Sequence, residues 1–133
     1  MQIILFSNSI FQKKNQKRLK IIDNFYNQKI TALSFSEKNL NKFFYFNGKE
    51  AVIDVLSYRL FSLRNVDKNL LSLINEFKNK TLPTLPVGAK VLIEKYNIQE
   101  GKSLGNILKM LEEEWVNNNF QLSEMQIKKI INR

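Results

Sequence analysis

The sequence predicts an all-α protein, an irregular multi-helix bundle of about six or seven short helices with a proline-containing strap near residues 81–87. Apolar residues recur at i, i+3, i+4 and i+7, which places them on one face of a helix, and residues typical of helix ends flank these series. Pro83 and Pro86 forbid helix and hold the residues before them extended. We therefore expect a helical body region over residues 1–80 and a C-terminal tail module over residues 81–133, which together form one compact unit.

The first expected helix begins with a capping-box pattern. Ser9 at the N-cap and Gln12 at the third helical position predict a helix that runs to about Tyr26. Its expected apolar face contains Phe11, Leu19, Ile22, Phe25 and Tyr26. The opposite side is basic, with Lys13, Lys14, Lys17, Arg18 and Lys20. We interpret this side as a solvated helix face, with a phosphate-facing surface as the alternative.

Three more helices complete the expected body region. Ser36 begins a short one that ends at Asn47 and Gly48, because both residue types tolerate the left-handed conformation. The next runs from Lys49 to Arg64, and Asp67 is a suitable N-cap for the one that follows and ends near Lys80. The positions expected to face the core are Leu40, Phe43, Phe44, Val52, Val55, Leu56, Leu60, Leu63, Leu70, Leu71, Ile74 and Phe77.

The tail module is expected to contain three helices. The first covers Ala89–Tyr96, turns Val91 and Leu92 inward and ends at Asn97. The second begins at residue 102, reaches about residue 116 and turns Leu104, Ile107, Leu108, Leu111 and Trp115 inward. Gly105 costs about 1 kcal/mol in a helix relative to Ala, so we expect another backbone or a ligand to come close to it. The third begins at a second capping box, Ser123 and Gln126, with Ile127, Ile130 and Ile131 inward and Leu122 stapled onto Ile127.

Composition narrows the function classes. The 133 residues include no Cys and no His, which excludes disulfides, thiolate metal sites and the most common general base. No stretch approaches 18 apolar residues, and no secretory signal is apparent, so we expect a cytoplasmic protein with no membrane partner. The formal charge of +9 favours a nucleic-acid partner. The abundance of Lys and Asn offers a different explanation, since both are frequent in proteins from AT-rich genomes.

The candidate binding residues are cations and one glycine. Gly101 and Lys102 start a helix, where free backbone N–H groups and the positive end of the helix dipole suit one phosphate of a nucleic-acid backbone. A Walker A loop is excluded, because Tyr96 stands where that motif needs its first Gly. Arg59 and Arg64, two of only four arginines, suit a bidentate contact with phosphate or a structural salt bridge. The full candidate set is Arg59, Arg64, Lys90, Lys95, Gly101, Lys102 and Lys109.

Carboxylates give no catalytic or metal candidates. Glu112, Glu113 and Glu114 are consecutive on a helix, so their side chains point about 100° apart and cannot converge on one ion. Asp54 and Asp67 lie on separate expected helices without paired spacing. We expect no catalytic residue, no metal site and no cofactor in this chain.

The C-terminal part resembles a known family. The residues that carry the resemblance are Pro86-Val87, Leu92-Ile93, Ile98, Gly101, Leu104-Gly105, Ile107-Leu108, Leu111-Glu112 and Trp115 through Phe120, with Gly48-Lys49-Glu50-Ala51-Val52-Ile53-Asp54 and Leu5-Phe6-Ser7-Asn8 upstream. They are similar to the C-terminal signature of bacterial CCA-adding tRNA nucleotidyltransferases, which are close relatives of bacterial poly(A) polymerases. Ala89 and Asn97 stand where that family usually has Gly, and Val91 where it has Asp.

The resemblance implies a function in RNA binding. It covers the helical body and tail, which in this family hold the tRNA acceptor and TψC arms through the sugar-phosphate backbone. The Gly-Ser motif and paired Asp-x-Asp of the family's catalytic head do not occur in this chain, so it is expected to be inactive alone. Magnesium and ATP or CTP are implied only for that head, which would be a partner alongside tRNA or another structured RNA.

Two other functions remain open from the sequence. The first is a stand-alone helix-turn-helix DNA-binding protein that uses residues 89–96 and 104–116, although the three glutamates would face the DNA groove. The second is a protein-interaction domain whose basic charge is only compositional.

Overall fold

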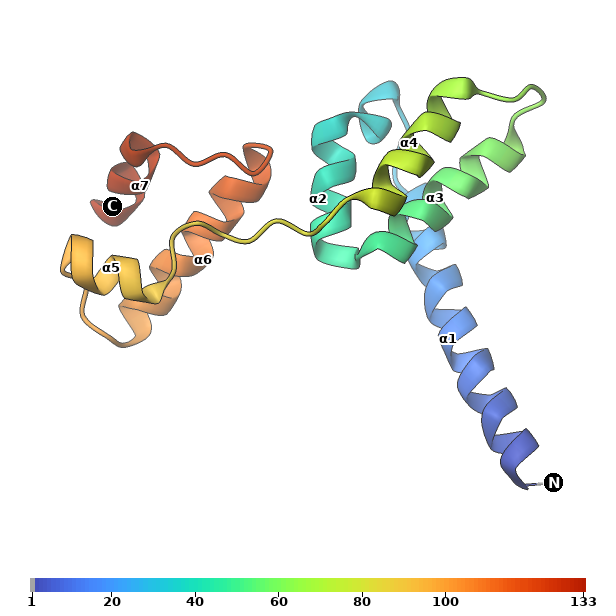
Figure 1. The fold of residues 1–133 in the computed structure, drawn as a ribbon, viewed down its shortest axis with the longest axis horizontal. Coiled ribbons are helices and arrows are strands. Elements are labelled where there is room, and N and C mark those ends of the chain that lie inside the picture. Colours follow the sequence, from blue (N-terminus) through green and yellow to red (C-terminus); the bar gives the residue numbers. More distant parts are fainter. Residues whose placement is uncertain (1) are drawn as a thin grey trace. The chain divides into compact units, whose positions relative to one another are not determined.

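The protein is all-α in the part of the chain that the structure describes. The computed structural model describes the backbone of residues 2–133 and the side chains of residues 12–133. Within it lie seven α-helices and one 3₁₀-helix, and no strand (Figure 1). Their bounds are α1 Gln2–Tyr26, η1 Ala32–Phe35, α2 Glu37–Asn47, α3 Lys49–Ser62, α4 Lys68–Asn79, α5 Ala89–Tyr96, α6 Lys102–Asn117 and α7 Glu124–Ile131. This confirms the predicted fold class.

The described chain forms two compact units. The first contains residues 2–36 and Phe46–Thr81, and the second contains Glu37–Tyr45 and Leu82–Arg133. Most of α2 thus belongs with α5, α6 and α7, although it precedes α3 in the chain. None of the described helices is both long enough and apolar enough to cross a bilayer.

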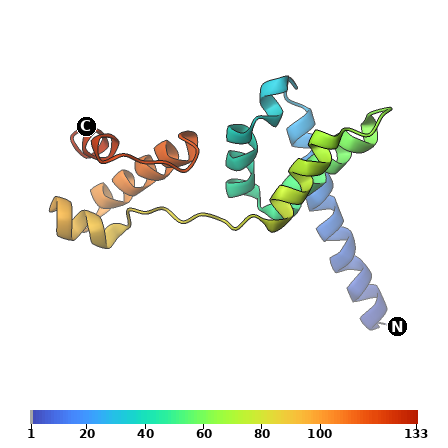
Figure 2. The same cartoon turned by 45° about the horizontal axis from the view of Figure 1, so that its top comes forward.

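The first unit is built on the α3–α4 hairpin, in which the two helices lie side by side (Figures 1 and 2). Its core uses the predicted stripe of α3, since Val52, Val55 and Leu56 are fully buried. Asp67 caps α4 as predicted, because its carboxylate accepts the N–H groups of Asn69 at 2.8 Å and Leu70 at 3.3 Å. Leu71 was expected in this core, but its side chain is 44% exposed, since α4 turns Leu70, Ile74 and Phe77 inward instead.

The prediction for the first helix was wrong in two respects. Ser9 lies inside α1, which begins at Gln2, because no Gly or Pro in residues 2–8 stops the helix. Leu19 is 60% exposed, because the face that packs on α3 carries Arg18, Ile21 and Phe25. Phe11, another expected core residue, lies outside the described side chains.

The second unit packs α6 against α5 and α7. The buried residues of its main cluster are Val87, Leu92, Leu104, Leu111, Ile127 and Ile130, and Leu122 packs against them. The capping box of α7 is present, because Gln126 N–H donates to Ser123 Oγ at 3.2 Å and Ser123 N–H donates to Gln126 Oε1 at 2.8 Å. Val91 was expected inward but is 37% exposed, because one face of the two-turn helix α5 suffices to bury Leu92.

An aromatic cluster joins α2 to the end of α6 within the second unit. The Trp115 ring lies 5.5 Å from the ring of Tyr45 and 5.0 Å from that of Phe120. Phe120 reaches this position because Asn119 and Phe120 both adopt positive φ after α6. The Phe120 N–H then donates to the Trp115 carbonyl at 2.8 Å, and the Asn119 side chain accepts a hydrogen bond from the buried Asn41. The asparagines at residues 117–119 therefore end α6, close to the predicted end at residue 116.

Candidate nucleic-acid interface

Gly101 fixes how α6 begins. It is the N-cap residue, with φ 140° and ψ −165°, a conformation that side chains disfavour. Its carbonyl accepts the Gly105 N–H at 3.3 Å, which closes the first turn. No side chain caps this end, so the backbone N–H groups of the first turn have neither an intrahelical acceptor nor a side-chain acceptor from residue 101. Free N–H groups at a helix start favour an anion, and the phosphate site at this position stays a prediction.

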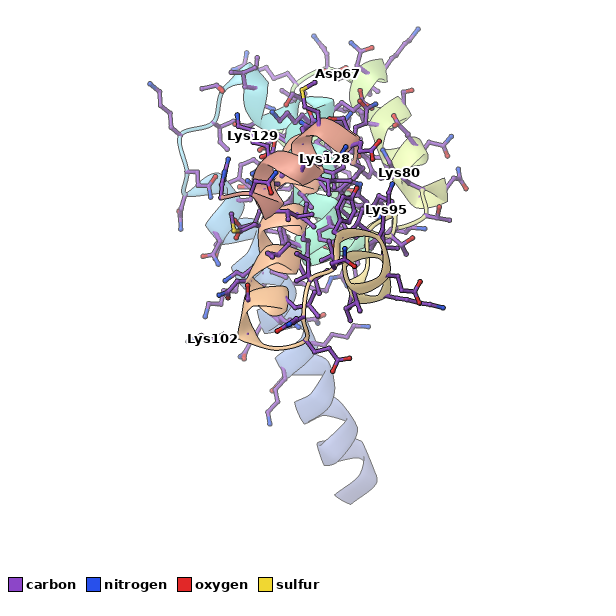
Figure 3. The ribbon with its side chains drawn as sticks, turned by 90° about the vertical axis from the view of Figure 1, so that its left-hand side faces the viewer. Asp67, Lys80, Lys95, Lys102, Lys128 and Lys129 are labelled. Atoms are coloured by element: carbon purple, nitrogen blue, oxygen red, sulfur yellow. The ribbon has the colours of Figure 1, made fainter. Side chains whose placement is uncertain are left out.

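Lys102 and Lys109 extend this start along one side of α6. They lie seven residues apart, which is about two helical turns, so both project from the same face. Both side chains are exposed, and no described carboxylate forms an ion pair with either one. Figure 3 labels Lys102 at the start of the helix. The two ammonium groups are thus available to phosphates spaced along a nucleic-acid backbone.

The acidic run on α6 is partly engaged within the second unit. Tyr45 donates its hydroxyl proton to Glu112 at 3.1 Å, and Gln126 lies 3.5 Å from Glu114. Glu113 is exposed and lies four residues beyond Lys109, so the cationic face of α6 ends there. No group of three or more described acidic residues could hold a metal ion.

Gly105 does not mark a close contact between protein segments. A methyl group built on it would meet no atom within 4 Å, because the residue faces solvent on the first turn of α6. The expectation of a close backbone approach was therefore wrong. The open surface beside Gly101 leaves the expectation of a ligand untested.

The two candidate lysines of α5 differ in their surroundings. Lys90 is exposed. Lys95 Nζ lies 3.4 Å from the Glu124 carboxylate, and the charge of Glu124 raises the pKa of Lys95. Glu124 also pairs with Lys128 at 3.7 Å, so α5 and the start of α7 share one carboxylate between two ammonium groups. Lys128 and its exposed neighbour Lys129, both labelled on α7 in Figure 3, are cations that sequence reasoning did not include.

The two candidate arginines lie in the first unit. Arg59 is half-buried, and its guanidinium lies 5.3 Å from the centre of the Phe35 ring. Arg64 follows the end of α3 and is exposed. The seven candidates are thus divided between the units, with only Lys90, Lys95, Gly101, Lys102 and Lys109 in the second.

A bidentate arginine contact does exist, but Arg18 makes it. Its Nε and Nη2 donate to the two oxygens of Asp54 at 3.0 and 2.8 Å, and Nη1 lies 3.3 Å from Glu50. The hydrogen bond to Asp54 raises the pKa of Arg18. The sequence prediction listed Arg18 on the basic side of the helix and as an interruption of its apolar face, and missed this role. The sequence does contain a signal for a buried role of Arg18. This residue lies three, four and seven positions before Ile21, Ile22 and Phe25, which places all four on one helical face.

A shallow pocket of about 220 Å³ lies beside this ion pair, between α1 and α3. Lys14 and Lys17 line it together with Arg18, but so do Glu50 and Asp54. The carboxylates of Glu50 and Asp54 already bind the Arg18 guanidinium, so an anion that entered this pocket would have to displace them. The pocket therefore supports a structural interpretation of the α1–α3 contact and not an anion site.

We expect the stability of the first unit to depend on pH because of Tyr26. Its hydroxyl donates to the Val55 carbonyl, and burial raises its pKa to about 12. The unfolded value is about 10, so this stabilisation is complete below about pH 10 and is lost as the pH rises to about 12. We expect a loss of about 1 kcal/mol, because the ring is only partly buried and solvent screens it.

The measurement is urea unfolding of the wild type and Tyr26→Phe at about pH 9 and about pH 11.5. Lysines lose their charge in both proteins, so only the difference between them reports on Tyr26. The free energy of unfolding of the wild type should exceed that of Tyr26→Phe by about 1 kcal/mol less at the higher pH. An equal advantage at both pH values would show that the hydroxyl titrates normally.

In comparisons with known proteins, no family model, no curated protein and no solved structure matches this chain.

Proposed function

We propose that this chain is the RNA-binding C-terminal region of a tRNA CCA-adding nucleotidyltransferase or poly(A) polymerase. It positions the acceptor and TψC arms of tRNA through contacts with the sugar-phosphate backbone. The observation that carries the proposal is the exposed face of α6, where an uncapped helix start at Gly101 continues into the unpaired ammonium groups of Lys102 and Lys109. Backbone N–H groups and lysines recognise phosphate without reading the base sequence.

The all-α fold supports the same proposal. The resemblance implies a helical body and tail, and the structure is helical on both sides of the strap. We assign the chemistry to a separate catalytic head, because Asp54 and Asp67 each have a structural partner and do not form a pair. Asp54 binds Arg18, and Asp67 caps α4. The resemblance implies magnesium and the nucleotide substrate for that head.

The proposal predicts that Lys102→Ala/Lys109→Ala weakens tRNA binding by at least about 10-fold at moderate salt. Each lysine that contacts a phosphate releases a counterion, so the slope of log K against log salt should also fall by about 0.7 to 0.9 per lysine. Fluorescence anisotropy with labelled tRNA over a salt series measures both quantities. Lys29→Ala/Lys38→Ala is the matched control, since it removes the same charge from two exposed positions outside α6.

Three outcomes decide the matter. A loss confined to the α6 variant supports the proposal. Equal losses of affinity in both variants indicate that only the net charge of the protein matters and not the position of the lysines. Unchanged affinity and salt slope in the α6 variant contradict the proposal. Duplex DNA of similar length is the competitor, and tighter binding to DNA than to tRNA favours the helix-turn-helix alternative.

A further inference from the structure

The turn between α3 and α4 exposes aromatic rings beside cations. We call the hairpin tip the surface formed by Tyr58, Phe61, Arg64, Val66 and Lys68. Phe61 is 85% exposed, Val66 72% and Tyr58 52%. These five residues lie at the end of α3, in the connecting turn and at the start of α4, so all belong to the segment that joins the two helices.

The exposed rings do not belong to the core of the first unit. The core face of α3 contains Val52, Val55 and Leu56, all fully buried. Tyr58 and Phe61 lie three residues apart and are neighbours on the helix surface. The Tyr58 ring rests at 4.7 Å from the ring of Tyr26, which fixes its orientation while half of the residue stays exposed. The tip thus exposes two aromatic side chains and one aliphatic side chain to solvent, and exposed apolar residues grouped in one segment favour a binding role.

The charge of the tip is positive. Arg64 and Lys68 are exposed, and neither forms an ion pair with a described residue. The nearest carboxylate in the sequence is Asp67, which is directed to the start of α4 by the backbone N–H groups that it accepts. Two exposed cations thus lie within seven residues of Phe61 in the chain, and the carboxylate of Asp67 accepts hydrogen bonds from the backbone of α4.

We infer that the hairpin tip binds unpaired nucleotides of RNA, with a base stacked on Phe61 and Tyr58 and the adjoining phosphates held by Arg64 and Lys68. This inference rests on the proposed function, because it assumes that the partner is RNA. A single strand offers flat base faces and a phosphate chain together, whereas a duplex hides its base faces in the stack. The tip therefore differs from α6, whose lysines contact the backbone of paired and unpaired RNA alike.

The polar residues around the rings favour RNA over a lipid surface. Ser62, Asn65 and Asn69 are exposed polar residues in the same segment of the chain, and the charged Asp67 lies among them in the sequence. Insertion into a bilayer would desolvate these groups along with the rings. Stacking of a base covers only a ring face and leaves them in water.

The test uses the full chain and two probes, a stem–loop RNA and a blunt RNA duplex with the same stem. We expect Phe61→Ala to weaken binding of the stem–loop by about 10-fold and to change binding of the duplex by less than about twofold. Phe61→Trp should preserve the affinity, and Phe61→Leu should lose it, because leucine is apolar but has no flat ring. Phe46→Ala is the matched control, since it removes another exposed phenylalanine outside the tip.

Several results would overturn the inference. Wild-type affinity of Phe61→Ala for the stem–loop would remove the stacking role, and wild-type affinity of Phe61→Leu would reduce it to apolar contact. Binding to phosphatidylserine vesicles that Phe61→Ala abolishes, with unchanged RNA affinity, would assign the tip to a membrane. Circular dichroism should show the same thermal midpoint for all Phe61 variants, because that side chain is almost fully exposed.

The lysine variant separates this inference from the proposed function. If Lys102→Ala/Lys109→Ala weakens both probes and Phe61→Ala weakens neither, only the role of the tip is wrong. If Phe61→Ala weakens the stem–loop alone and the lysine variant has no effect, the tip binds RNA and the proposed role of α6 is wrong.

Discussion

Replacement of Trp115 by alanine is expected to lower the free energy of unfolding of the second unit by about 3 to 5 kcal/mol. The indole is 2% exposed and contacts the rings of Tyr45 and Phe120, so its loss leaves a cavity between α2 and the end of α6. A unit of about sixty residues has a total stability of only about 3 to 9 kcal/mol. The variant should therefore be at or near the limit of folding.

Amide hydrogen exchange in α6 and α7 measures this loss and separates it from events in the first unit. Trp115 is the only tryptophan in the chain, so its fluorescence follows unfolding of the same unit in the wild type. Met125→Ala serves as the control, because Met125 is 80% exposed in that unit and its truncation should cost less than about 0.5 kcal/mol. Wild-type protection of α6 in the Trp115 variant would mean that the aromatic cluster does not hold the unit together.

Replacement of Gly101 by valine is expected to destabilise the start of α6 by about 1 to 3 kcal/mol and to weaken tRNA binding with it. This loss of stability comes from backbone strain, because φ is 140° at Gly101. A steric clash does not contribute, because a Cβ at this position would meet no atom within 4 Å. A side chain strains this conformation, and relief of the strain would move the N–H groups that the proposed phosphate site uses. Thermal unfolding and tRNA anisotropy measure the two effects.

The other two glycines of the tail provide matched controls for this variant. Gly88 is the N-cap of α5 with an ordinary φ of −94°, so Gly88→Ser should change stability by only a few tenths of a kcal/mol. Gly105 lies inside α6 with open space around it, so Gly105→Ala should stabilise the helix by about 0.5 to 1 kcal/mol. If Gly101→Val changes stability as little as Gly88→Ser does, the helix start can adopt another conformation, and the proposed phosphate site loses its geometric basis.

The sequence predicted helix ends correctly where a single residue type caps the helix or adopts a left-handed conformation there. Asp67 and Ser123 cap helices as predicted, and Asn97 ends α5 in the left-handed conformation, with φ 55° and ψ 33°. These predictions depend on hydrogen bonds and torsion angles within four or five residues, so they need little information about distant parts of the chain. Ser9 is the exception, because its capping pattern also fits the interior of a helix and nothing in residues 2–8 stops α1.

The candidate interface was predictable only in part. The exposed cations of α6 follow from helical spacing, because Lys102 and Lys109 lie opposite the apolar face of Leu104, Leu111 and Trp115. The partners of Lys95 and Arg18 did not follow, since Glu124 and Asp54 lie 29 and 36 residues further along the chain. Sequence spacing cannot indicate such pairs, because the angle at which two helices pack decides which charges meet.

The sequence by itself determined an all-α protein, the helix ends fixed by Asp67, Asn97, Gly101 and Ser123, and the excess of positive charge. These properties come from backbone torsion angles, periodicity and composition, which are local or additive. Only the tertiary structure decided that part of α2 packs with the tail helices, that Arg18 is held by Asp54, and that Phe61 faces solvent. The physical reason is that burial and ion pairing depend on which helix faces meet, and apolar residues lie on more than one face of these helices.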